Sequence, residues 1–151
     1  MVRFLVLFPS DSIEASFAVQ LLERLQRSYK EVWIGALIPE QNAWITLGPV
    51  KADETMLFRK TPGEYRNQIR DFLPDYLIDL SCEPRFWLFK KRTQLIHFTL
   101  NAKRVNAIRE IRDTDDRYEA YYDELDKLLS AFELAENDKI VWKMVMEFMD
   151  K

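Results

Sequence analysis

The stretch that decides the fold opens the chain: residues 3–12 read RFLVLFPSDS. The apolar run that ends at Phe8 is typical of a strand buried on both faces, and Ser10, Asp11 and Ser12 behind it are good N-cap residues for a helix. Apolar residues at helical spacing follow up to about residue 29, and a second apolar run fills residues 32–38. Strand, helix and strand in this order predict a βαβ unit with two parallel strands.

The same pattern returns more weakly downstream. We expect a short helix from Pro39 to Leu47, a third strand at 55–58 and a fourth at 75–80. A helix opened by Pro62 lies between these two strands. Its apolar positions share one side of the helix and are Tyr65, Ile69, Phe72 and Leu73. Each added strand and helix extends the parallel sheet.

Residues 86–102 fit two interpretations. Residues 95–98 suit a strand, whereas the unbroken length and the apolar positions between Leu88 and Leu100 suit a helix. We prefer the helix, and the fifth short strand is then expected at 105–108. The predicted class is α/β, with a small parallel Rossmann-like sheet of about five strands and flanking helices.

After Asp113 the pattern is helical only. The first helix carries an apolar stripe, which consists of Tyr118, Tyr121, Tyr122, Leu125, Leu128, Leu129 and Phe132. A second helix is expected from about residue 137, and its apolar face consists of Val141, Met144, Val145, Phe148 and Met149. We expect residues 1–112 to form the α/β domain and residues 113–151 to form a helical segment packed on the same domain. The second stripe is core packing or a dimer seam.

Composition limits the class of protein. The 151 residues have the size of one domain, and the single cysteine, Cys82, excludes an internal disulfide. A reducing cytoplasm is therefore the expected compartment. The longest stretches without a charged residue are ten residues long, too short to span a membrane. The apolar start is too short for a signal peptide, so we expect it to remain as the first strand.

The charges are unevenly distributed, although the formal net charge is only -3. Residues 85–112 hold eight Lys/Arg and one Glu, a local net of +7, and residues 113–138 hold ten Asp/Glu and two Lys/Arg, a local net of -8. The negative total argues against nucleic-acid binding. The two segments are either solvated faces or partners in charge pairing, within one chain or between subunits.

The candidate ligand site is the loop after the first strand, because ligands of parallel sheets bind beyond the carboxyl ends of the strands. Ser10, Asp11 and Ser12 are the candidate ligand-binding residues of this loop. It has no G-x-G-x-x-G motif and the whole chain has only 3 Gly, so we expect no dinucleotide and no other cofactor. No metal site is expected either. Asp11 and Glu14 are helix caps, which we prefer, or one of them is a general base.

A basic cluster interleaved with aromatic residues follows the fourth predicted strand. Arg85, Lys90 and Lys91 are candidates to bind a phosphate or an acidic sugar, and a solvated helix face is the simpler interpretation. His97 and Cys82 lack the partners that nucleophilic catalysis requires. We expect a packed or surface imidazole and an inert buried thiol.

Several local strings resemble the N-terminal, acceptor-side half of the bacterial heptosyltransferases, which build the lipopolysaccharide core with two Rossmann-like domains. VLFPSDSIE at 6–14 looks like the family's P-S-S-L-G-D-type loop, and DYLIDL at 75–80 resembles its Y-D-L-V-I-D-L strand. AKRVNAI at 102–108 is similar to the family's A-R-R-R-I-G-F strand, and RY at 117–118 loosely matches its R-Y-L-x-L-L helix. The resemblance covers about residues 1–132.

Departures from the family pattern decide what the resemblance implies. The family's catalytic Asp, the base for the acceptor hydroxyl, corresponds to Glu14, and its loop Gly corresponds to Ile13. Family members bind the nucleotide-sugar donor mainly in a C-terminal half, and this sequence stops where that half would begin. The resemblance thus implies a binding or partner module in envelope glycan assembly that is not catalytic alone, with Glu14 as candidate base and an acidic or phosphorylated sugar as ligand.

Two alternatives remain from the sequence. One is a half-transferase that is active only with a partner chain or as a dimer. The other is a structural interaction protein that dimerises through its C-terminal helix.

Overall fold

A computed structural model describes the backbone of residues 1–149 and the side chains of residues 1–131. Five parallel strands form one sheet in the order β3-β2-β1-β4-β5. The strands are β1 (Val2–Leu7), β2 (Val32–Pro39), β3 (Glu54–Phe58), β4 (Tyr76–Asp79) and β5 (Ile96–Thr99). β1 pairs with β2 from Val2 beside Val32 to Leu7 beside Leu37, as the βαβ prediction requires. The predicted α/β class with a small parallel sheet is confirmed.

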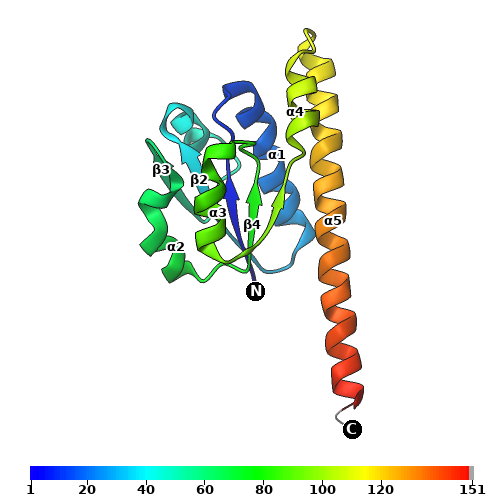
Figure 1. Ribbon diagram of the computed structural model, residues 1–151. Coiled ribbons are helices and arrows are strands. Elements are labelled where there is room, and N and C mark those ends of the chain that lie inside the picture. The colour runs from blue at the N-terminus through cyan, green and yellow to red at the C-terminus, as the bar shows by residue number, and fades with distance from the viewer. Residues whose placement is uncertain (150–151) are drawn as a thin grey trace.

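Helices cover both faces of the sheet (Figure 1). The helices are α1 (Ser12–Ser28), α2 (Arg66–Phe72), α3 (Trp87–Thr93), α4 (Ala102–Arg109) and α5 (Thr114–Met149), and three 3₁₀ turns are η1 (Glu40–Leu47), η2 (Pro62–Tyr65) and η3 (Pro84–Phe86). Alternate residues of β1 point to opposite faces. Phe4 and Val6 pack with residues of α1 and α5, whereas Leu5 and Leu7 pack with residues of α2 and α3. The sheet therefore has two cores, one on each side.

The prediction for residues 86–102 is wrong in its preferred form. The helix α3 ends at Thr93 because Gln94 adopts a left-handed conformation with φ 56°, and residues 96–99 form the edge strand β5. The β-branched and aromatic residues of IHFT fit a pleated strand better than a helix. Apolar spacing alone did not separate the two, since the run is short.

The fifth strand predicted at 105–108 is a helix instead. The side chain of Asn101 accepts a hydrogen bond from the Arg104 N–H at 3.2 Å and caps the start of α4. Val105 and Ile108, three positions apart, form the buried side of that helix. The string similar to the family's A-R-R-R-I-G-F strand is therefore helical here, which removes that part of the resemblance.

Two further expectations need correction. Leu73 does not share the buried side of its helix; it follows α2 with φ 51° and is 73% exposed. The chain after Asp113 forms one helix, α5, without the break predicted before residue 137. The apolar face predicted at Val141 to Met149 lies outside the described side chains.

The first half of α5 joins the core beside α1. Tyr121, Leu125, Leu128 and Leu129 are buried in the same cluster as Phe4 and Val6. Figure 1 shows α5 running past α1 and α4 and on beyond the sheet. The division into 1–112 and 113–151 stays a prediction. Within the described part of the chain, none of the helices contains the extended apolar stretch that spanning a membrane requires.

Candidate functional site

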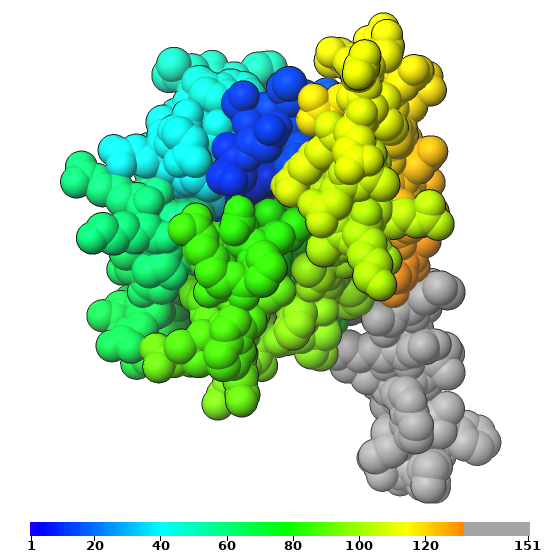
Figure 2. All heavy atoms as spheres, turned by 45° about the horizontal axis from the view of Figure 1, so that its top comes forward, coloured from blue at the N-terminus to red at the C-terminus, as the bar shows by residue number. Residues whose placement is uncertain are grey.

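The two central strands bring the candidate loops together at the carboxyl edge of the sheet. β1 and β4 are neighbours, and beyond their last pair the N–H of Leu80 donates to the Leu7 carbonyl at 2.9 Å. Figure 2 looks toward this edge and shows the N-terminal segment, in blue, bordered by the cyan, green and yellow parts of the chain. The loop that contains Ser10 to Ser12 and the loop that follows Asp79 therefore leave neighbouring strands.

The loop after β1 is held by two polar side chains. Asp11 caps α1, because its Oδ1 accepts the N–H groups of Ile13 and Glu14, each at 3.0 Å. The buried Asn42 of η1 donates to the carbonyls of Pro9 and Ser10, each at 3.0 Å. Asp11 is thus the helix cap that we preferred, and its carboxylate is exposed to solvent. Ser10 and Ser12 flank Asp11 in the same loop.

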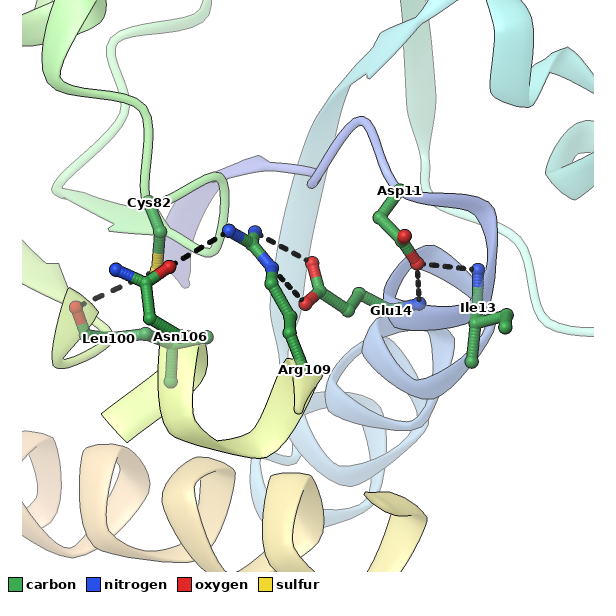
Figure 3. Close-up of polar contacts among 7 residues, drawn as sticks. All are labelled: Asp11, Ile13, Glu14, Cys82, Leu100, Asn106 and Arg109. Carbon is green, nitrogen blue, oxygen red and sulfur yellow. Dashed lines mark hydrogen bonds and ion pairs between the residues drawn. The ribbon is translucent and has the colours of Figure 1, made fainter. Parts of the chain in front are cut away.

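Glu14 forms an ion pair with Arg109 of α4 (Figure 3). Its Oε1 accepts from Nε of Arg109 at 2.6 Å and its Oε2 accepts from Nη2 at 3.0 Å. The Glu14 side chain is 1% exposed and that of Arg109 is 38% exposed. Nη1 of Arg109 also donates to Oδ1 of Asn106 at 3.1 Å, which fixes the guanidinium. The hydrogen bonds that Arg109 donates to Glu14 raise the pKa of Arg109.

A second buried pair lies at the end of β4. Oδ1 of Asp79 accepts the N–H of Ser81 at 2.8 Å and its hydroxyl at 2.6 Å. Oδ2 of Asp79 lies 2.8 Å from Nζ of Lys90, whose side chain is 17% exposed. Lys90, a predicted ligand-binding residue, therefore neutralises a buried carboxylate.

The charges of Glu14 and Arg109 act on two further groups, Cys82 and Tyr121. Burial, and after it the charge of Asp79, raises the pKa of the Cys82 thiol to about 11. Sγ lies 3.9 Å from the Leu100 carbonyl, and the backbone of Cys82 has φ 52°. Burial first and the charge of Glu14 second raise the pKa of the Tyr121 hydroxyl. Both groups stay protonated at neutral pH, and Cys82 is half-buried rather than buried as we expected.

The remaining predicted residues lie apart from Glu14. Arg85 is exposed, lies 3.5 Å from Glu83 and stacks over the Phe86 ring at 4.8 Å. Lys91 is exposed on α3. Arg85 borders a groove of about 670 Å³ between α2 and α3, and none of Ser10, Asp11, Ser12 or Glu14 lines it. The structure brings Ser10, Asp11, Ser12 and Glu14 together and leaves Arg85 and Lys91 elsewhere.

Charge pairing between the basic and acidic segments is not found among the described side chains. The basic segment, residues 85–112, pairs with acids that precede it, at Glu14, Asp79 and Glu83. In the acidic segment, Asp126 pairs with Arg24 of α1 and Glu124 with the nearby Lys127. Up to residue 131, the last described side chain, the pairing within one chain that the sequence left open does not join these two segments.

Sequence reasoning missed Arg109, Asn42 and the role of Asp79. Arg109 follows the residues that we predicted as a strand, so its position beside α1 could not be seen. The Asn101 cap was the available signal, since a helix from 102 would have placed Arg109 in its last turn. Asn42 had no sequence signal. Asp79 had one, since an acid inside an apolar strand demands a partner when it is buried.

This arrangement limits the chemistry of the edge. A general base needs an oxygen that faces the proton it removes. Both oxygens of Glu14 accept from Arg109, and the side chain is closed to solvent. The described residues contain no group of three His, Cys, Asp or Glu that could hold a metal ion.

Comparisons with known proteins place the fold. No protein-family model and no curated protein matches the chain. The chain is similar to a solved structure described as "The crystal structure of the glycosyl transferase family 9 from Veillonella parvula DSM 2008", with a TM-score of 0.57 and 16% sequence identity. The alignment covers 84% of this chain and 41% of that chain, so this chain spans about two fifths of its length. The fold is therefore one found in a glycosyltransferase.

Proposed function

We propose that this chain is a glycosyltransferase-type α/β module that is not catalytic by itself and acts by binding. The observation that carries the proposal is the Glu14–Arg109 pair. By the sequence resemblance Glu14 corresponds to the base of the heptosyltransferases, and both of its oxygens accept hydrogen bonds from Arg109 in a buried pair. A carboxylate used in this way stabilises the fold rather than activating a hydroxyl.

The ligand class that we propose for the carboxyl edge is an acidic or phosphorylated sugar, with bacterial envelope glycan assembly in the cytoplasm as the setting. The resemblance of the 6–14 loop to the heptosyltransferase loop supports this proposal. The exposed Ser12 and the half-buried Ser10 beside the start of α1 support a polar ligand, since N–H groups at a helix start attract anions. Lys90 is not part of this ligand site, because it is paired with Asp79.

A comparison of wild type with Glu14→Gln tests the proposal. Purified full-length protein is incubated with ADP-, UDP- and GDP-linked sugars and a lipopolysaccharide-core acceptor, and nucleotide release is measured. We expect release no greater than that of Glu14→Gln, together with a lower thermal unfolding midpoint for the variant. Wild-type release that Glu14→Gln abolishes, with the unfolding midpoint unchanged, would contradict the proposal.

The half-transferase is the second candidate, and one observation favours it. The solved glycosyltransferase aligns with this chain over only 41% of its own length, which leaves room for a separate partner to complete a cleft. Under this alternative, nucleotide release would occur only with a co-purified second chain and would require Glu14. The dimerising structural protein depends on residues beyond 131, whose side chains are not described.

A further inference from the structure

A second candidate site lies on the sheet face opposite α1. A groove of about 670 Å³ runs between η2 and α2 on one side and η3 and α3 on the other. Its apolar lining includes the buried side chains of Ile69 and Phe89, which are 5% and 8% exposed. Figure 1 shows α2 and α3 on the same side of the sheet, away from α5. The groove is therefore separate from the carboxyl-edge loop discussed above.

Four arginines border this groove. Arg66 and Arg70 come from α2, Arg85 comes from η3 and Arg92 comes from α3. No Asp or Glu is among the lining residues, and Arg66, Arg70 and Arg92 form no ion pair with a described acid. Like charges that line one concave surface repel one another, and a bound anion removes that repulsion. The arginines thus favour an anionic occupant.

Exposed leucines add an apolar requirement. Leu73 and Leu88 line the groove and are 73% and 39% exposed. Leu73 holds φ 51° at the end of α2, a position where glycine or asparagine is the less strained choice. Neither helix geometry nor solvent favours leucine there. A ligand that covers Leu73 and Leu88 would remove both apolar side chains from water.

The dimensions favour a small molecule over a helix of another protein. α2 and α3 have seven residues each, which corresponds to a helix length of about 10 Å. A stable protein interface buries about 800 Å² on each partner, more than two such short helices offer. A volume of about 670 Å³ lies within the range of small-ligand sites.

We propose that this groove binds a small anionic amphiphile. Its phosphate or carboxylate lies between the arginines of α2 and those of η3 and α3, because guanidinium groups pair with such oxyanions in two-point geometry. Its apolar body covers Leu73 and Leu88 and contacts the buried Ile69 and Phe89. The inference does not depend on the function proposed for the carboxyl edge.

Calorimetric titration of the full chain with decyl phosphate, below its micelle concentration, tests the groove. We expect one site per chain. Decyl glucoside, which is neutral, and inorganic phosphate, which lacks the apolar body, should each bind at least about tenfold more weakly. Equal affinity for decyl glucoside, or for inorganic phosphate, would overturn the proposal.

Variants locate the binding. Arg70→Gln combined with Arg92→Gln should lower the affinity for decyl phosphate at least about tenfold, since each variant removes a charged hydrogen-bond donor to the phosphate. Leu88→Gln should weaken the binding of decyl phosphate and leave the affinity for inorganic phosphate unchanged. Arg104→Gln, an exposed arginine on α4, is the matched control and should bind like wild type. Unchanged affinity in folded groove variants, or binding of an acidic peptide but not of decyl phosphate, would overturn the proposal.

Discussion

The carboxyl edge and the α2–α3 groove both concentrate charge, yet they use it in opposite ways. At the edge, the side chains of Glu14 and Asp79 are each 1% exposed. Each carboxylate forms an ion pair, with Arg109 and Lys90 respectively. In the groove, three of the four arginines are exposed without an acid partner among the described side chains. A buried charge must be paired for the fold to form, whereas exposed charges remain available to a ligand. The difference indicates that the edge charges maintain structure and the groove charges are free to bind.

Removing Lys90 tests the structural side of the comparison and should give the largest effect. Lys90→Met leaves the buried Asp79 carboxylate with Ser81 alone, which should lower the free energy of unfolding by about 3 kcal/mol. Urea denaturation measures the loss. Lys91→Met, one residue along and exposed, is the matched control and should change the stability by less than about 0.5 kcal/mol. Equal losses in the two variants would end the distinction between paired and free cations.

The pKa of the Cys82 thiol measures how far the carboxyl edge is shielded from solvent, because burial is the main cause of its shift. Thiolate absorbance, measured as the difference between wild type and Cys82→Ser, should show no midpoint below pH 10, because the pKa is raised to about 11. The unfolded chain loses this proton near pH 9 and the folded chain retains it to about pH 11. The free energy of unfolding should therefore fall as the pH rises through this window. A midpoint near pH 9 in the folded protein would show an open edge.

The groove arginines should contribute little to stability. Arg70→Gln combined with Arg92→Gln removes two like charges and no described ion pair, so the unfolding free energy should change by less than about 0.5 kcal/mol or rise slightly. The same urea denaturation measures it. A loss comparable to that of Lys90→Met would mean that the groove, like the edge, uses its charges for the fold.

Sequence patterns were sufficient for the central strands β1 and β2, because buried parallel strands are continuous apolar runs. The runs ending at Phe8 and at Ile38 marked β1 and β2, and their βαβ geometry followed. Residues 96–99 and 102–109 were misassigned, since an edge strand and a short helix with two buried positions carry little periodic signal. Local caps at Gln94 and Asn101 decide these elements.

The candidate site was less predictable than the fold. The position of Asp11 before a helix predicts that it caps the helix, and the structure confirms this cap. The pairing of Glu14 with Arg109 joins residues 95 positions apart, and the pairing of Asp79 with Lys90 depends on how α3 packs. One sequence identifies such acids as needing partners and does not identify the partners. The groove was also missed, because its arginines come from separate elements.

A double-mutant cycle on Glu14 and Arg109 tests the central claim most directly. The free energies of unfolding of wild type, Glu14→Gln, Arg109→Met and the double variant are measured in urea. A structural ion pair predicts a coupling energy of about 1.5 kcal/mol or more, with the exposure of Arg109 keeping it below the value for a fully buried pair. A coupling energy below about 0.5 kcal/mol would contradict the claim that Glu14 serves the fold through Arg109.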